Sequence, residues 1–308
     1  RKGKPGPFYL GVHYTAPHSP WDRKNHPPEL YDGYFNDCPF NSVPPLMPPP
    51  LWAENVSMPA KDEETRRIRL SGYFTAITAM DSQVGRLLKW LDDNNLRQNT
   101  LIFFTSDNGM NMGHHGLWGK GNASRPMNMF EESVRVPFIA SCPGRIPSRK
   151  RCGEMLSHYD FLPTILDFTG TKGPSDPKLP GRSFAAILAG KPSSGHEQLV
   201  VFDEYGPVRM VRTREWKYVL RNKPWFNELY DLVNDPGETK NLIDDPSRRA
   251  VVKELSDRLH EWFTRYSDPA KDGFNEPVNG RGQMYLCGTA GKDRKVYHDP
   301  DPPNNVRS

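Results

Sequence analysis

Asp107 and Asn108 are the residues whose types and spacing point most directly to chemistry. They follow the apolar run Leu101–Thr105, which favours a buried strand, within the sequence Ser-Asp-Asn-Gly. In an open α/β sheet, ligands bind beyond the carboxyl ends of the strands. A carboxylate beside an amide oxygen is a hard, all-oxygen donor pair that suits Ca2+ or Mg2+. The alternative is a plain turn, since Asn-Gly is a favoured turn dipeptide.

A glycine-rich loop at residues 113–121 carries two histidines and a lysine, in the order Gly-His-His-Gly-Leu-Trp-Gly-Lys-Gly. Glycines let backbone and cation approach an oxyanion closely. Lys120 offers a compact ammonium with three hydrogen-bond donors, which can hold an anionic oxygen or protonate a leaving group. Taken by itself, the lysine is equally compatible with an ordinary solvated surface.

His18 is a third candidate, far upstream in the chain. It follows Phe8–Val12, a short apolar run typical of a strand covered on both faces. If that strand belongs to the same sheet, His18 lies past its carboxyl end, on the edge that bears Asp107. Imidazole, which titrates at about pH 6.5, then serves as an acid or an anion ligand. The alternative is a loop histidine without a function.

The elements that must position these residues begin with a helix predicted over Glu63–Leu91. Its apolar residues recur at spacings of four and three and form one stripe. With a strand before it and Leu101–Thr105 after it, the pattern predicts a right-handed parallel crossover. Val134–Ser141 is predicted as a further strand, and Tyr159–Phe168 as a short helix that ends at Gly170. The stripe comprises Tyr73, Ile77, Met80, Val84, Leu87 and Leu91.

From about Gln198 the pattern changes to short strands lying close together in the sequence. The runs Leu199–Tyr205, Val208–Arg212 and Trp216–Leu220 predict an antiparallel sheet. An amphipathic helix over residues 252–266 closes this region. We therefore predict a catalytic domain over residues 1–195, a small subdomain over 196–268 and an extended tail over 269–308.

Composition narrows the class of protein. The 308 residues carry a formal net charge of +4 with acidic and basic residues interleaved, which argues against nucleic-acid binding. No apolar stretch approaches the length of a membrane span, and no signal peptide is visible. A disulfide between Cys142 and Cys152 stays open.

The proline-rich excursion over residues 21–60 is long enough to build or cover a site. Its aromatic residues either stack on a sugar ring or pack in the loop; they are Trp21, Tyr31, Tyr34, Phe35 and Trp52.

Several blocks, in order along the chain, together resemble the sulfatase family within the alkaline-phosphatase-like superfamily. The blocks are residues 7–20, 105–120, 135–138 and 160–166, followed by 216–218 and 228–242. The resemblance implies an α/β, alkaline-phosphatase-like sandwich with a mostly parallel central sheet, its N-terminal part missing. A small antiparallel α+β subdomain is expected to follow.

The same resemblance implies roles for five residues. Asp107 and Asn108 would be two ligands of a divalent metal, usually Ca2+, with Mg2+ as the alternative. Lys120 and His18 would contact the sulfate and help to protonate the leaving alcohol oxygen, and His115 would line the pocket. Substrates would be sulfated small molecules or glycans, and the location secreted, periplasmic or lysosomal. The oligomeric state stays open.

The attacking group of a sulfatase is a formylglycine made within a Cys-x-Pro-Ser-Arg motif, and that motif is absent here. In residues 142–149 the Pro-Ser-Arg lies too far from Cys142. The family's first pair of metal-binding aspartates is missing as well. We therefore expect an incomplete sulfatase that is inactive by itself. The alternatives are a phosphodiester or phosphonate hydrolase of the same superfamily, and a non-catalytic protein that binds metal or glycan. An Asn at position 108 favours a sulfatase over these phosphoryl-transfer relatives, which often carry His there.

Overall fold

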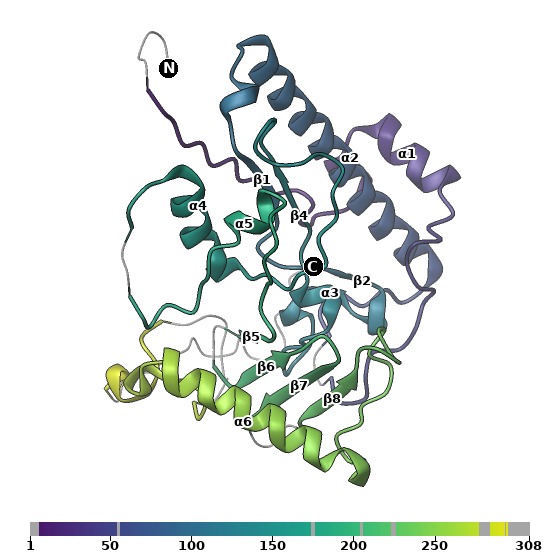
Figure 1. Ribbon diagram of the computed structural model, residues 1–308. Coiled ribbons are helices and arrows are strands. Elements are labelled where there is room, and N and C mark those ends of the chain that lie inside the picture. Colours follow the sequence, from purple (N-terminus) through teal and green to yellow (C-terminus); the bar gives the residue numbers. More distant parts are fainter. Residues whose placement is uncertain are drawn as a thin grey trace. The chain divides into compact units, whose positions relative to one another are not determined.

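The computed structural model describes residues 6–53, 56–173, 176–203, 206–222, 226–276, 284–292 and 294 (Figure 1). The chain divides into two compact units. The first comprises Arg1–Pro48, Pro59–Thr100 and Met112–Gly116, and the second comprises Pro49–Met58, Leu101–Asn111 and Leu117–Ser308. Among the described residues, no helix is long and apolar enough to cross a membrane.

The first unit is built around the long helix α2 (Glu63–Asp93), which confirms the predicted helix. The Asp62 carboxylate caps it by accepting a hydrogen bond of 2.7 Å from Thr65 N. Only the first half of α2 is well covered, with Leu70, Thr75 and Ala76 buried there. The predicted apolar stripe is half-buried, and Leu87 at its far end is 37% exposed.

A second helix, α1 (Pro28–Asp37), lies beside α2 (Figure 1). Tyr31 is buried between them and donates a hydrogen bond of 3.2 Å to Ile68 O on α2. The proline-rich excursion over residues 21–60 therefore contains a ten-residue helix that was not predicted. Pro28 at the first helical position is the sequence signal for this helix.

The predicted strand at Phe8–Val12 does not form. The segment has no secondary structure, and Tyr9 and Leu10 are 87% and 65% exposed. A strand needs a neighbouring strand to satisfy its N–H and C=O groups, and an apolar run specifies no such neighbour. The predicted parallel crossover that began with this strand is therefore absent from the described residues.

In the second unit, β1 (Ile102–Thr105) pairs antiparallel with β4 (Phe138–Ser141). Both strands were predicted, without a direction for the pairing between them. The predicted second strand begins late, because α3 (Glu131–Val134) occupies its expected start. The strands are also half-buried rather than buried. In the sequence, β2 (Asn111–Met112) and β3 (Trp118–Gly119), each two residues long, come between β1 and β4.

Two short helices pack near β4. The helix α4 (Phe161–Thr169) ends at Gly170, whose φ of 67° is left-handed, as predicted for its C-terminus. The second is α5 (Ala185–Leu188). Cys142 is buried against their apolar residues, and Cys152 is exposed. Both are free thiols, so the disulfide considered for this pair is not formed.

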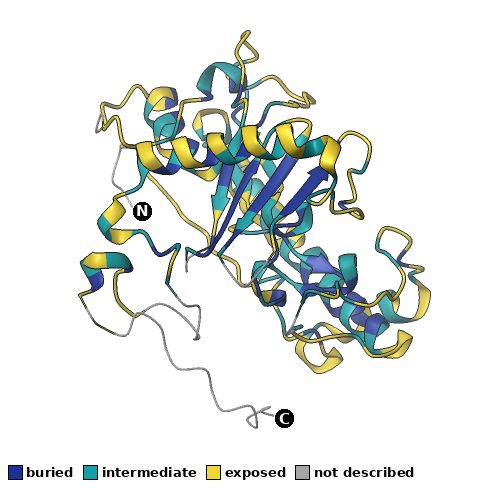
Figure 2. Ribbon diagram, turned by 90° about the horizontal axis from the view of Figure 1, so that it is seen from below, coloured by how far each residue is buried: buried dark blue, intermediate teal, exposed yellow. Residues whose placement is uncertain are grey.

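The C-terminal sheet is antiparallel, as predicted, with order β5-β6-β7-β8. Its strands are β5 (Leu199–Phe202), β6 (Val208–Arg212), β7 (Trp216–Arg221) and β8 (Glu228–Asp231). The helix α6 (Arg249–Tyr266) covers one face (Figure 1). Its Leu255 and Leu259 are buried against the sheet. In Figure 2 the strands are buried behind α6, whose outward side is exposed.

Residues 269–276, at the start of the predicted tail, contact this sheet. Arg209 on β6 forms an ion pair with Asp272. Its guanidinium stacks between the rings of Phe263 and Phe274, 3.7 and 4.5 Å from their centroids. Most of the tail beyond residue 276 lies outside the described residues. The domain boundaries at 195/196 and 268/269 remain a prediction.

Candidate functional site

The turn that follows β1 presents Asp107 and Asn108. Asn108 N donates to Asp107 Oδ1 at 2.9 Å, and Asn108 Nδ2 donates to Gly109 O at 2.8 Å. Asp107 is exposed and Asn108 is half-buried. Within the described residues, Asp107 Oδ2 and Asn108 Oδ1 make no hydrogen bond or ion pair. One oxygen of each side chain is therefore available to a hard cation.

This donor pair fits Ca2+ or Mg2+ in kind. Ca2+ takes about six to eight oxygen ligands. Asp107 and Asn108 would supply two of them, so the pair is part of a metal site and not a complete one.

Gly109 fixes this turn against α3. Its N–H donates to Ser133 O at 2.9 Å. A Cβ at position 109 would lie 2.0 Å from Glu132 O and 2.9 Å from Arg135 O. No side chain fits there without displacing backbone, so glycine is required for the close approach.

Lys120 lies directly after β3, with an extended backbone of φ −91° and ψ −156°. Its side chain is half-buried. Lys120 O accepts a hydrogen bond of 2.8 Å from Ala123 N. Its ammonium makes no hydrogen bond or ion pair within the part of the chain that the structure describes. A partly buried cation without an anionic partner is suited to binding an anion from solution.

A buried polar network, which the sequence did not reveal, connects the Lys120 loop to α3. Asn128 Nδ2 donates to Lys120 O at 3.1 Å and to Gly121 O at 3.0 Å. Ser133 Oγ donates to Asn128 Oδ1 at 2.6 Å and accepts from Asn111 Nδ2 at 2.7 Å. Asn111, Asn128 and Ser133 are at most 4% exposed.

Ser133 therefore serves two parts of the candidate site. Its carbonyl holds the turn of Asp107 and Asn108, and its hydroxyl holds the loop of Lys120. The segment Met127–Val134 supports both. We call it the supporting segment.

The two predicted histidines lie in the first unit. His18 is exposed, with Nδ1 2.9 Å from Ser19 O, and its backbone N donates to Thr15 O at 2.9 Å. His115 is half-buried in a 3-10 turn with left-handed φ of 53° and ψ of 24°. The structure thus brings Asp107, Asn108 and Lys120 onto one scaffold. That the histidines complete their site remains a prediction.

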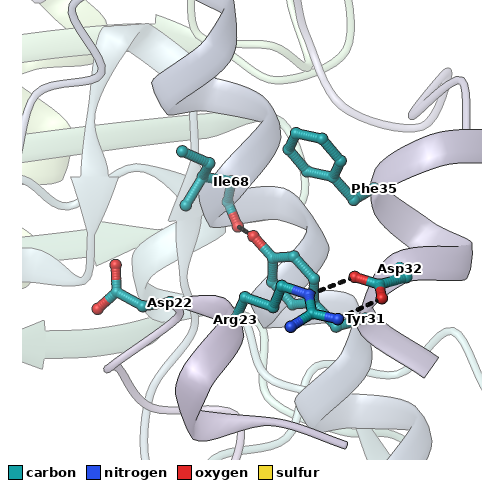
Figure 3. A pocket seen from close by; sticks show the side chains of 6 residues that line it. All are labelled: Asp22, Arg23, Tyr31, Asp32, Phe35 and Ile68. Carbon is teal, nitrogen blue, oxygen red and sulfur yellow. Dashed lines mark hydrogen bonds and ion pairs between the residues drawn. The ribbon is translucent and has the colours of Figure 1, made fainter. Parts of the chain in front are cut away.

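A hollow of about 380 Å³ in the first unit contains none of the five predicted residues (Figure 3). Its polar side is closed by a bidentate ion pair in which Arg23 Nε and Nη2 lie 2.6 and 2.5 Å from the Asp32 oxygens. The hydrogen bond from Arg23 holds the pKa of the Asp32 carboxyl below its usual value. The charges of Arg23 and Asp32 are therefore paired with each other and are not available to a substrate. Its lining residues are Asp22, Arg23, Tyr31, Asp32, Phe35 and Ile68.

Two of the expected sugar-stacking aromatics are also engaged in packing. Trp21 is 4% exposed and donates a hydrogen bond of 2.9 Å to Pro17 O. Tyr31 is 3% exposed. In the second unit, Trp52 packs against Phe130 and the Arg221 guanidinium. Trp21 and Tyr31 are thus too buried to stack on a sugar ring, whereas Trp52 is half-buried.

Comparison with known families assigns most of the chain. The model of the sulfatase family matches residues 2–171, more than half of the chain. A second model, N-sulphoglucosamine sulphohydrolase, C-terminal, matches residues 113–265. The second match covers the supporting segment and the C-terminal sheet together.

Individual relatives agree with this assignment. An uncharacterized sulfatase, YidJ, of Escherichia coli strain K12 is 32% identical over 275 residues, which is 85% of this chain and 52% of the relative. An arylsulfatase of Clostridium perfringens is 28% identical over 288 residues, covering 84% of this chain and 55% of the relative. The chain therefore spans about half the length of these curated relatives.

Solved structures show the same fold. A structure in complex with its substrate D-glucosamine-2-N,6-O-disulfate has a TM-score of 0.58 and 28% identity, covering 70% of this chain and 45% of that one. A 2-O GAG sulfatase has a TM-score of 0.61 and 25% identity, covering 85% and 59%. The predicted α/β, alkaline-phosphatase-like fold is thereby confirmed. The chain belongs to the sulfatase family, within the alkaline-phosphatase-like superfamily.

Proposed function

We propose that this chain forms part of a sulfuric ester hydrolase, which splits a sulfate ester with water into an alcohol and sulfate. Sulfate ester hydrolysis is supported at the level of the family. One observation carries the assignment to particular residues. A pair of metal-type oxygens on Asp107 and Asn108 and the unpaired ammonium of Lys120 are both held by the supporting segment.

Each residue has a role that follows from its chemistry. Asp107 and Asn108 would hold Ca2+, or Mg2+, through one oxygen each. The bound cation would supply positive charge to the sulfate oxygens. Lys120 would hold a sulfate oxygen and protonate the leaving alcohol oxygen. His18 would assist as a second acid or anion ligand, and His115 would line the pocket.

The attacking group would come from polypeptide outside these 308 residues. Nowhere in the sequence does a Cys-x-Pro-Ser-Arg motif occur, so no formylglycine can be made here by the family's route. We therefore propose that the chain by itself binds the anion and the metal weakly and does not turn over substrate.

The substrate would be a sulfated glycan or small molecule. Relatives of this chain include an N-acetylglucosamine-6-O-sulfatase of Bacteroides thetaiotaomicron at 30% identity and a choline-sulfatase of Rhizobium meliloti at 30% identity. The two differ in substrate at similar identity. Similarity to these two relatives therefore does not select between a sulfated sugar and choline sulfate as the substrate.

The proposal is tested by joining the chain to a segment that carries the formylglycine motif and comparing aryl sulfate with aryl phosphate as substrates. We expect Ca2+-dependent hydrolysis with a higher kcat/KM for the sulfate, and no turnover by the 308 residues alone. A higher kcat/KM for the phosphate would instead support the phosphoryl-transfer alternative. Turnover of sulfate by the isolated chain would overturn the proposed origin of the attacking group.

A further inference from the structure

Lys217 is a fully buried lysine on β7, with 0% of its side chain exposed. Its Nζ lies 2.9 Å from Met129 O, 2.8 Å from Glu131 Oε1 and 2.6 Å from Glu238 Oε1. An ammonium has three N–H donors. Lys217 thus donates a hydrogen bond to Met129 O and forms ion pairs with the carboxylates of Glu131 and Glu238.

Lys217 is not the only cation beside these carboxylates. Arg212 Nε lies 3.1 Å from Glu131 Oε1, so two cations face the carboxylates of Glu131 and Glu238. Burial opposes ionisation of Glu131, but Lys217 and Arg212 outweigh it and hold its pKa below the usual value. Burial raises the pKa of Glu238 despite the nearby Lys217. Loss of Lys217 would leave a buried carboxylate without compensation.

Two of the three partners of Lys217 belong to the supporting segment. Met129 gives its carbonyl and Glu131 its carboxylate. Glu238 contacts the same segment, since its Oε2 accepts a hydrogen bond of 2.6 Å from Glu131 N. The Lys217 cluster thus ties β7 and the loop after β8 to the supporting segment.

The supporting segment holds both parts of the candidate site. Ser133 O accepts from Gly109 N at 2.9 Å, which fixes the turn of Asp107 and Asn108. Asn128 Nδ2 donates to Lys120 O at 3.1 Å. Lys217 contacts this segment directly at Met129 O and Glu131 Oε1, and through Glu238 at Glu131 N. The segment therefore connects Lys217 to both parts of the candidate site.

We infer that Lys217 is a positioning residue, which sets the placement of the Asp107–Asn108 turn and the Lys120 loop by anchoring the segment that supports them. The inference rests on the proposed function for the identity of the site. A purely structural lysine would stabilise the whole unit evenly. A positioning lysine protects particular amides.

The test is backbone hydrogen exchange on the 308-residue chain, under conditions where every variant is folded. In Lys217→Met we expect about tenfold faster exchange at Gly109 and Ala123, whose N–H groups hydrogen-bond to Ser133 O and Lys120 O. Amides of α4 should exchange as in the parent chain. The matched control is Arg209→Met, which removes a buried cation of the same sheet whose ion pair is with Asp272. This control should leave Gly109 and Ala123 unchanged.

Two results would overturn the inference. One is unchanged exchange at Gly109 and Ala123 in Lys217→Met, and the other is an equal acceleration in Arg209→Met. If Lys217→Met does not fold, Lys217→Arg replaces it. Arg keeps the charge, but its planar fork does not match three converging acceptors. Faster exchange at the same two amides supports the inference, and unchanged exchange contradicts it.

Hydrogen exchange does not require sulfate hydrolysis. A chain that shows the expected exchange pattern but no sulfatase activity after completion would contradict the proposed function alone. Retained activity with an unchanged pattern would contradict only the role of Lys217.

Discussion

Lys217 and Lys120 are two lysines of the same unit that have opposite surroundings. Lys217 is fully buried, and its three donors face two carboxylates and a carbonyl. Lys120 is half-buried, and its ammonium has no partner among the described residues. The ammonium of Lys217 is occupied by protein partners and has a structural role, whereas the ammonium of Lys120 is available to bind an anion. The difference separates a structural cation from a candidate catalytic one.

The largest expected difference between the two lysines is the effect of Lys217→Met on the stability of the fold. Removing one partner of a buried charge cluster costs about 3–5 kcal/mol of stability, because it leaves a buried carboxylate unpaired. We expect a loss of that size in the free energy of unfolding, measured by urea denaturation. Lys253→Met is the control, since Lys253 is 77% exposed in its pair with Asp257. It should change stability by less than about 0.5 kcal/mol. Equal losses in both variants would remove the distinction.

Lys120→Ala should show the reverse. In a polypeptide completed with the formylglycine segment, loss of a group that protonates the leaving oxygen lowers kcat by about 10²–10⁴-fold. Stability should change by less than about 1 kcal/mol, because no described contact of the ammonium is lost. The comparison uses steady-state kinetics on an aryl sulfate beside urea denaturation. A full kcat in Lys120→Ala would show that this ammonium does not act.

Ser133→Ala probes the support between the two lysines. The Ser133 hydroxyl donates to Asn128 Oδ1 and accepts from Asn111 Nδ2. Its removal leaves the buried Asn128 Oδ1 without this donor, whereas Asn111 Nδ2 keeps its hydrogen bond to Gly119 O. We expect a stability loss of about 1–3 kcal/mol by urea denaturation. Ser82→Ala is the control, because Ser82 is exposed and bonds only to Thr78 O within its own helix. A loss of stability no larger than that of Ser82→Ala would mean that the Ser133 hydroxyl does not stabilise this network.

The smallest expected effect is a change in the pH dependence of stability, produced by Glu238→Gln. Burial raises the folded-state pKa of Glu238 above its ordinary value. Just above that ordinary value the folded chain holds more protons than the unfolded chain, so stability falls as pH rises through this window. Glutamine does not titrate and should flatten that slope relative to the parent chain. Urea denaturation between about pH 4 and about pH 7 measures it. An identical dependence of stability on pH in the parent chain and in Glu238→Gln would contradict the raised pKa of Glu238.

The sequence predicted those features that depend on local pattern. The helix α2 and the strand β6 lie at their predicted places. The apolar period that predicts the helix and the apolar run between turn residues that predicts the strand are both properties of residues close together in the sequence. Asp107, Asn108 and Lys120 were selected from the ordered blocks that resemble the sulfatase family, and their roles remain a prediction. None of these predictions needed knowledge of a distant contact.

The features that depend on distant contacts were not predictable. Phe8–Val12 has the pattern of a strand, yet no neighbouring strand is specified by that pattern. Asn128 and Ser133 look like ordinary polar residues, and only burial beside Lys120 O gives them a role. Lys217 in Trp-Lys-Tyr looks like a surface lysine on an alternating strand. Its three partners come from residues 129, 131 and 238.

The most direct test of the difference between the two lysines is an NMR titration of their ammonium groups. The 308-residue chain, with 15N-labelled lysine side chains, is titrated with sodium sulfate against sodium chloride at equal ionic strength. Lys120→Arg and Lys217→Arg identify the two signals. We predict that sulfate shifts the Lys120 ammonium signal and leaves that of Lys217 in place. A sulfate-dependent shift at Lys217, or none at Lys120, would contradict the assignment of Lys120 as the anion-binding lysine.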